Sequence, residues 1–167
     1  TPNSLDEWLT HISQVHFLTV DLSVSRIQAV AKKLKLLTPK ALVITVGGTN
    51  GKGSTIKCLE SIYTAADFRV GCYTSPHLYR YNERITFCGE EACDEDLSAA
   101  FSYIDHGRDD IALTFFEFTV LAALYYFQEK ACDVILLEVG VGGRMDAVNI
   151  IDPDLAVITN VSLDHVA

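Results

Sequence analysis

The sequence predicts an α/β fold in which a mostly parallel sheet carries helices on both faces. Apolar runs alternate along the chain with segments whose apolar residues recur at helical spacing, and this alternation is typical of strand–helix–strand units. A glycine-rich turn joins the apolar run at 41–46 to a helical pattern at 53–66, which makes the fold P-loop-type. Because the strands are apolar throughout, we expect both faces of the sheet to be buried.

Each expected element carries its own signal. Ser4 and Glu7 form a capping box that opens a first helix, and Ser23 opens a second helix that ends before Pro39. The remaining elements, in chain order, are a strand at 69–74, a hairpin at 85–90, a helix capped by Asp94 that reaches about Asp105, a helix from the Thr114–Glu117 capping box to about Lys130, and buried strands at 133–139 and 155–159.

The turn at 47–54 reads Gly-Gly-Thr-Asn-Gly-Lys-Gly-Ser and predicts a phosphate-binding loop. Glycines let backbone amides approach phosphate oxygens closely, and the following helix points its positive end at the same place. The pattern departs from the usual P-loop at Val46 and at Gly53. We expect the phosphates of ATP to bind at Thr49, Asn50, Gly51, Lys52, Gly53 and Ser54.

Composition narrows the class of protein. The 167 residues are enough for one domain, and the net charge of −9 leaves no basic face for nucleic acid. An anionic ligand must then be held by local charges and a metal ion. The five cysteines include no C-x-x-C pair, which favours reduced thiols and a cytoplasmic protein. The apolar stretch 111–127 contains Glu117 and is short for a membrane span, so we expect a buried helix.

Polar residues follow four of the predicted strands. In a parallel sheet, ligands bind beyond the carboxyl ends of the strands, so we expect residues 47–54, 75–77, 138–149 and 160–165 to meet in one crevice. Ser75, Glu138 and His165 are then candidate ligands for Mg²⁺, which prefers oxygen. Two alternatives remain open: Glu138 pairs with Arg144, and His165 is structural. Arg144 itself could bind a phosphate or pair with Asp146.

Taken together, five motifs resemble one family. They are Gly48-Thr-Asn-Gly-Lys-Gly-Ser54, Ser75-Pro-His-Leu78 with Asn82-Glu-Arg-Ile85, Leu113-Thr-Phe-Phe-Glu117, Glu138-Val-Gly-Val-Gly-Gly-Arg-Met-Asp146, and Asp164-His165. These motifs and their order resemble the Mur-ligase-like family, and specifically its folylpolyglutamate synthase/dihydrofolate synthase branch. On chemistry alone, Arg84 in the second motif could equally be an exposed surface residue. We interpret Glu117 as a helix cap.

The resemblance implies roles for matching positions. Lys52, Glu138 and His165 would be catalytic, and Ser75, Glu138 and His165 would be the magnesium ligands. The positions that would line a pterin site are Val20, Leu22, Thr114, Phe116, Asp146 and Ala147. The family usually has threonine where this chain has Val148, so we assign no polar contact there.

The implied activity is an ATP- and Mg²⁺-dependent ligase. It would join a pteroate or folate carboxylate to L-glutamate through an acyl phosphate, as a monomer that binds neither nucleic acid nor membrane. Residues 1–167 would be the truncated amino-terminal ATP-binding domain, with a sheet that is incomplete without the rest of the domain. A carbamylated lysine and a carboxy-terminal domain would lie outside the chain, and we expect this piece to be inactive alone.

Three alternatives remain. A Mur-type ligase of cell-wall precursors would share the Gly-Thr-Asn-Gly-Lys loop, although Ser75-Pro-His and Leu113-Thr-Phe-Phe-Glu117 argue against it. A nucleotide-dependent binding module would bind ATP without forming product. An inert fragment would have an incomplete crevice.

Overall fold

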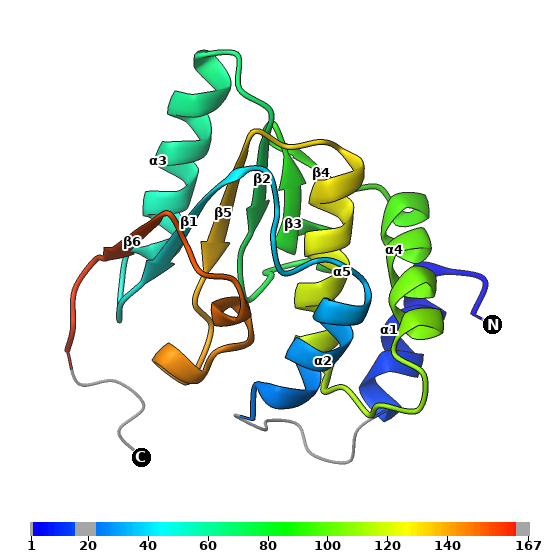
Figure 1. Cartoon of the computed structure of the whole chain (residues 1–167). Helices are drawn as coiled ribbons and strands as arrows, with labels where there is room; N and C mark the ends of the chain where they lie inside the picture. The colour runs from blue at the N-terminus through cyan, green and yellow to red at the C-terminus, as the bar shows by residue number, and fades with distance from the viewer. Residues whose placement is uncertain (1, 16–22, 163–167) are drawn as a thin grey trace.

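The computed structural model describes residues 2–15 and 23–162. Its sheet has the strand order β4-β3-β2-β5-β1-β6 (Figure 1). β1 pairs in parallel with β5 and β6, and β2 pairs in parallel with β5, whereas β3 and β4 are antiparallel. The strands are β1 Leu42–Gly47, β2 Val70–Tyr73, β3 Ile85–Phe87, β4 Glu90–Glu91, β5 Val134–Glu138 and β6 Leu155–Ile158. The predicted fold class and the predicted hairpin are confirmed.

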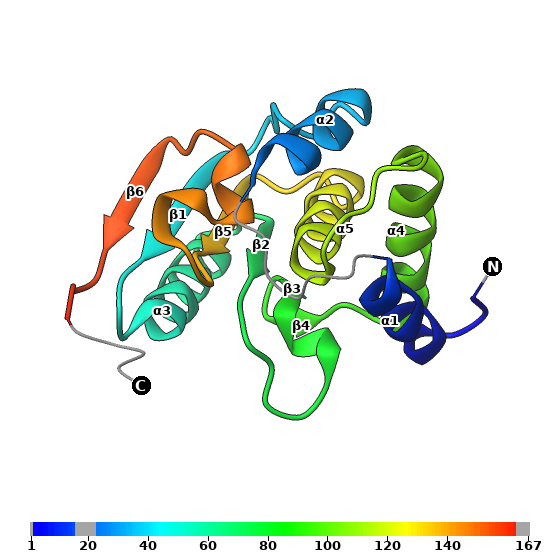
Figure 2. The same cartoon turned by 90° about the horizontal axis from the view of Figure 1, so that it is seen from below.

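Helices cover both faces of this sheet. α3 lies against one face, and α2 and α5 lie against the other, with α4 and α1 packed outside α5 (Figures 1 and 2). The helices are α1 Leu5–Gln14, α2 Ser25–Lys33, α3 Lys52–Ala65, α4 Asp94–Gly107 and α5 Phe115–Glu129. No helix in the described residues is long and apolar enough to cross a membrane.

The central strands are buried on both faces because successive side chains point to opposite sides. In β1, Ile44 and Val46 pack in a cluster with Ile56 of α3. Val43 instead joins the larger core that includes Ile135 of β5 and the helices of the opposite face. A continuous apolar run is therefore what a central parallel strand requires.

The expectation that 155–159 forms a buried strand is wrong. β6 is the terminal strand of the sheet order and pairs with β1 alone among the described strands. Leu155 is 51% exposed and Ile158 is 66% exposed. An apolar run indicates a strand but does not say whether that strand is central or terminal.

The two predicted capping boxes differ in outcome. At α5, Thr114 Oγ1 accepts the amide of Glu117, and the Glu117 carboxylate accepts the amide of Thr114, so this box is complete. At α1, Ser4 Oγ accepts the amide of Glu7 at 3.3 Å, but the Glu7 carboxylate binds the amide of Asn3 instead of that of Ser4. Half of the α1 prediction is therefore confirmed.

Two helix starts differ from the sequence-based expectation. α2 begins at Ser25 with Val24 in the N-cap position, and the Ser23 hydroxyl lies 2.9 Å from that of Ser25. Asp94 is the first residue inside α4, because Cys93 has the extended backbone of the N-cap. Serine and aspartate both favour the first turn as well as the cap, so either residue marks the start of a helix to within one or two positions.

The carboxyl ends of β1, β2, β5 and β6 lie at the same edge of the sheet (Figure 1). Three short 3₁₀ helices that the sequence analysis did not anticipate lie in or beside the connections at this edge. They are η1 Tyr81–Arg84, η2 Gly143–Met145 and η3 Ala147–Ile150. The connections that follow the parallel strands therefore meet at one place, as the sequence predicts.

Candidate active site

The connection between β1 and α3 leaves backbone amides at the start of a helix. Gly51 is the N-cap of α3 and has φ of 82°, a left-handed conformation that glycine adopts without strain. The first helical hydrogen bond runs from the Thr55 amide to the Gly51 carbonyl. The amides of residues 52–54 precede that bond and so lie outside the hydrogen-bond ladder of the helix. They are at its amino-terminal end, where the helix dipole places a partial positive charge. This arrangement suits an anion.

The first half of the loop is bound to the segment after β6. The amides of Thr49 and Asn50 donate to the backbone carbonyl and the side-chain oxygen of Asn160, both at 3.0 Å. Thr159 Oγ1 donates to the Asn50 carbonyl at 2.6 Å. A β-carbon on Gly48 would collide with Thr159 and Asn160. The sequence analysis assigned no role to Asn160. The one sequence feature that could have indicated a role is its position directly after a predicted strand.

Lys52 and Glu138 lie within electrostatic range of each other at the carboxyl edge of the sheet. Lys52 Nζ donates to the carbonyls of Gly48 and Thr49 at 2.8 and 3.3 Å, so its side chain folds back over the loop. Glu138 ends β5, is 6% exposed and accepts the amide of Ser75 at 3.0 Å. Burial raises the pKa of Glu138, while the Ser75 amide and the charge of Lys52 act against that rise.

The alternative that Glu138 pairs with Arg144 is not what the structure shows. The Glu138 carboxylate bonds the Ser75 amide and lies within electrostatic range of Lys52. Arg144 is exposed. The connection after β5 instead places Arg144 on the wall of a cavity that Gly47, Gly48 and Val139 also line.

Side chains from α5 and from two connections surround Gly140. A β-carbon placed on Gly140 would lie 2.8 Å from Phe116 Cζ, 3.2 Å from Ser75 Oγ and 3.3 Å from Asp146 Oδ2. A β-carbon on Gly53 would likewise lie 3.9 Å from a Glu138 oxygen. The structure therefore brings together the phosphate loop, a hydroxyl, two carboxylates and an aromatic ring.

Asp146 organises the connection after β5. Its side chain is almost fully buried, and Oδ2 accepts the amides of Gly140 and Val141 at 2.9 and 2.8 Å. Oδ1 accepts the amide of Val148 at 3.0 Å. Burial raises the pKa of Asp146, and these amides act against that rise. Asp146 therefore binds backbone amides, in place of the ion pair with Arg144 that the sequence left open.

Replacing Asp146 with alanine should destabilise the protein by about 3 kcal/mol, because three backbone amides would lose a charged acceptor that is itself almost fully buried. Chemical denaturation of the variant measures this loss. The matched control is Asp152→Ala, since Asp152 is an exposed carboxylate in the same part of the chain. Equal stability of the two variants would contradict the structural role of Asp146.

Of the other predicted pterin residues, Thr114 and Phe116 lie at the start of α5 and Ala147 at the start of η3. The Thr114 hydroxyl is buried and serves the helix cap, and Glu117 also forms an ion pair with Arg26 at 3.2 Å. The interpretation of Glu117 as a cap is therefore confirmed. The half-buried Phe116 ring meets Tyr73 edge to face, with ring centroids 6.0 Å apart. Ala147 is the first residue of η3 and is 7% exposed.

Three of the predicted site residues, Val20, Leu22 and His165, lie outside the described residues. Within the described residues, no group of three or more His, Cys, Asp or Glu side chains could hold a metal ion. The oxygens of Ser75 and Glu138 are the part of the predicted magnesium site that can be placed.

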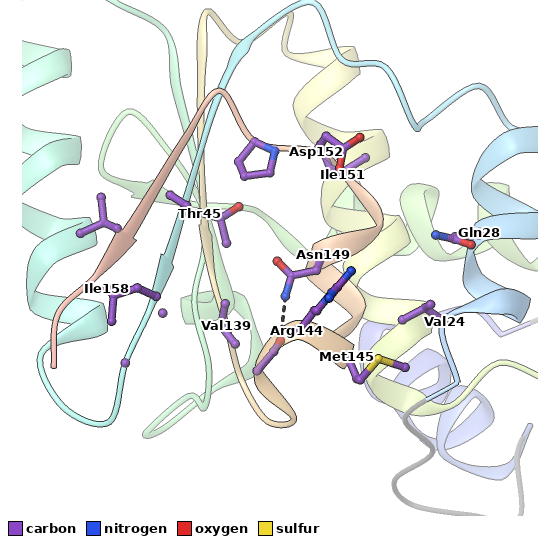
Figure 3. A pocket seen from close by; sticks show the side chains of 16 residues that line it. Val24, Gln28, Thr45, Val139, Arg144, Met145, Asn149, Ile151, Asp152 and Ile158 are labelled. Atoms are coloured by element: carbon purple, nitrogen blue, oxygen red, sulfur yellow. Dashed lines mark hydrogen bonds between the residues drawn. The ribbon is translucent and has the colours of Figure 1, made fainter. Parts of the chain in front are cut away.

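A cavity of about 670 Å³ opens beside the phosphate loop, between β6, α2 and the two 3₁₀ helices after β5 (Figure 3). Arg144 and Asn149 line it from one side and Ile158 from the other, with Asn149 Nδ2 donating to the Gly143 carbonyl at 2.7 Å. Its size is that of a small-molecule pocket. Arg144 is thus placed beside the loop, where contact with an anionic group is possible.

Comparison with known protein families identifies the family of this chain. Residues 46–167, from the end of β1 onward, match the family model of the Mur ligase middle domain. The chain belongs to this family. It is also similar to the dihydrofolate synthase/folylpolyglutamate synthase of Haemophilus influenzae, with 50% identity over 96% of the chain, and to that of Escherichia coli, with 48% identity over 96%.

Solved structures match closely as well. Escherichia coli FolC in complex with DHPP and ADP is 47% identical over 99% of the chain, with a TM-score of 0.96. A bifunctional folylpolyglutamate synthase/dihydrofolate synthase with Mn, AMPPNP and L-glutamate bound is 47% identical over 99%, with a TM-score of 0.93. The chain spans 37% and 38% of the two curated relatives and 41% and 40% of these two structures.

Proposed function

We propose that residues 1–167 are the amino-terminal ATP-binding domain of a ligase that joins a pteroate or folate carboxylate to L-glutamate. The observation that carries this proposal is the meeting of the Lys52 loop, Ser75, Glu138 and Phe116 at one edge of the sheet. The names of the relatives support the substrate class.

ATP would bind with its phosphates at the start of α3. The amides of residues 51–54 and the charge of Lys52 would neutralise phosphate oxygens, while Thr49 and Asn50 keep the loop in shape through Asn160. Ser75 and Glu138 fit Mg²⁺, because both offer hard oxygen ligands and the buried carboxylate gains from a nearby cation. Outside the described residues, His165 would complete this ligand set.

The chemistry requires no nucleophilic side chain. A substrate carboxylate oxygen attacks the γ-phosphorus of ATP, and ADP leaves, which gives an acyl phosphate. The glutamate amine then attacks the carbonyl carbon and loses a proton as phosphate leaves. Lys52 and the loop amides stabilise the charge on the transferred phosphoryl group, and bound Mg²⁺ would add to that stabilisation.

The pterin ring would lie against Phe116, whose half-buried ring offers a flat apolar face. The rest of this site would be lined by Asp146, Ala147 and Thr114. Val20 and Leu22 would cover it.

Phe116→Ala should weaken binding of the pterin substrate roughly 10-fold, about 1.4 kcal/mol, and change ATP binding much less. Steady-state kinetics with each substrate varied in turn measure both effects. Phe68→Ala, which removes an exposed ring near α3, is the control. If Phe116→Ala lowers only the melting temperature, Phe116 is a core residue and not a pterin contact.

Release of ADP by the full-length protein tests the proposed function. Dihydropteroate and L-glutamate are each omitted in turn, and we expect release only when both are present. ATP turnover without either substrate would favour a nucleotide-dependent module. Turnover with a cell-wall nucleotide and an amino acid would instead identify a Mur-type ligase. We expect residues 1–167 alone to bind nucleotide weakly and to show no turnover.

We also propose that the protein is a cytoplasmic monomer that contacts neither nucleic acid nor membrane. All five cysteines are free, and burial raises the pKa of the Cys132 thiol to about 12. Free thiols, two of them buried, are compatible with a reducing compartment.

A further inference from the structure

The connection between β2 and β3, residues 74–84, carries Ser75 and is named here the Ser75 loop. Its first residues are bound at two points. The Thr74 amide donates to the Arg84 carbonyl at 2.9 Å, and the Ser75 amide donates to Glu138 at 3.0 Å. The loop is therefore closed on itself and attached to the end of β5.

A carboxylate holds the far part of the Ser75 loop. Glu83 accepts the amides of Leu78, Tyr79 and Arg80 at 2.8, 2.7 and 2.7 Å. These amides hold the pKa of Glu83 below its ordinary value. Leu78 and Tyr79 are 84% and 93% exposed, so polar contacts and not packing hold this part of the loop, whereas Tyr81 farther along is buried in the core.

Arg84 connects the Ser75 loop to α5. Its Nε donates to His77 Nδ1 at 2.8 Å, which requires the lone pair of that nitrogen. The guanidinium carbon lies 5.8 Å from the centroid of the Tyr81 ring and 5.9 Å from that of Phe115. Phe115 is the first residue of α5 and precedes Phe116. A planar guanidinium suits this combination of one directed bond and two ring contacts.

We propose that Arg84 is a positioning residue that holds the Ser75 hydroxyl in register with Glu138 and Phe116. It acts through His77 on the Ser75 loop and through Phe115 on the start of α5. This inference rests on the proposed function, in which Ser75 and Glu138 hold the metal ion and Phe116 holds the pterin. Arg84 itself touches neither the metal nor the substrate in this role.

The test compares variants of the full-length protein by their Mg²⁺ dependence. Arg84→Met should raise the Mg²⁺ concentration for half-maximal turnover about 10-fold, the effect typical of residues that orient metal ligands. Arg84→Lys keeps the charge but not the planar donor, so we expect it to recover only part of this loss. The control is Arg80→Gln, which removes the same charge from the same loop, where Arg80 binds Glu91.

A matched pair at His77 tests the proposed connection. His77→Asn keeps an acceptor near the position of Nδ1 and should stay close to wild type. His77→Leu removes the acceptor and should resemble Arg84→Met. Because Arg84 and His77 act on the Ser75 loop through the same hydrogen bond, the double variant Arg84→Met/His77→Leu should be little worse than Arg84→Met alone.

Binding of Mn²⁺ in the presence of AMPPNP, followed by electron paramagnetic resonance, separates this inference from the proposed function. If the wild type binds Mn²⁺ but forms no amide, the proposed function fails, and weaker Mn²⁺ binding by Arg84→Met still supports the positioning role. If Arg84→Met lowers only the melting temperature and matches Arg80→Gln in metal dependence, the inference is wrong. Failure of the wild type to bind Mn²⁺ overturns it as well.

Discussion

Replacing Lys52 with alanine is expected to reduce turnover of the full-length protein by about a thousandfold, the effect of removing a strong electrostatic contact to a reacting group. The Lys52 ammonium donates to the loop carbonyls of Gly48 and Thr49 and lies within electrostatic range of Glu138. The loop amides alone carry only partial charges and would not replace it. Single-turnover measurements of acyl phosphate formation would locate the loss in the first chemical step.

The control for this prediction is Lys57→Ala. Lys57 lies on the same helix and pairs with the buried carboxylate of Glu60, so its removal tests for the combined effects of lost charge and lost local stability on α3. Both variants should fold, because neither side chain is part of the core. Unchanged ATP-dependent activity in Lys52→Ala would remove the phosphate-loop assignment.

Glu138→Gln is expected to have opposite effects on activity and on stability. Turnover should fall by at least roughly 100-fold, about 3 kcal/mol, because a neutral amide is a poor ligand for Mg²⁺. The ligand-free protein should be slightly more stable than wild type at neutral pH. Melting curves and activity assays on the same preparation measure the two effects together.

The sign of the stability change follows from the pKa of Glu138, which burial raises above its ordinary value. A carboxyl group with a raised pKa in the folded state favours folding below its unfolded pKa, and this contribution is lost as pH rises through the folded pKa. Glutamine avoids that loss and can still accept the Ser75 amide. The difference in melting temperature should therefore shrink as the pH falls and Glu138 becomes protonated.

A lower melting temperature for Glu138→Gln at neutral pH would mean that the charged carboxylate stabilises the ligand-free protein. Its electrostatic attraction to Lys52 would then outweigh the cost of burying the charge. Activity close to wild type would exclude Glu138 from the metal site. Glu129→Gln, at the exposed end of α5, is a control for loss of one negative charge.

Local features of the chain could be predicted because they depend on neighbours in sequence. The complete Thr114–Glu117 cap needs residues only three positions apart. The burial of β1 and β5 follows from continuous apolar runs. The sequence also placed Ser75 and Glu138 at strand ends, and parallel pairing brings those ends together.

Contacts between distant segments could not be predicted in the same way. Asn160 binds amides more than 100 positions earlier in the chain, and nothing in its local sequence indicates a partner. The position of β6 at the end of the sheet depends on strand order, which an apolar run does not encode.

By itself, the sequence determined the α/β class, the phosphate-binding loop and the polar residues that end its strands, because glycine conformation, helix capping and burial act over a few residues. Only the tertiary structure decided how the polar groups are used. It placed Asp146 on three backbone amides and Arg84 between His77 and two aromatic rings. A buried charged group must form hydrogen bonds with the groups that lie within reach in the folded chain. Tertiary packing determines which groups those are, so the local sequence does not indicate them.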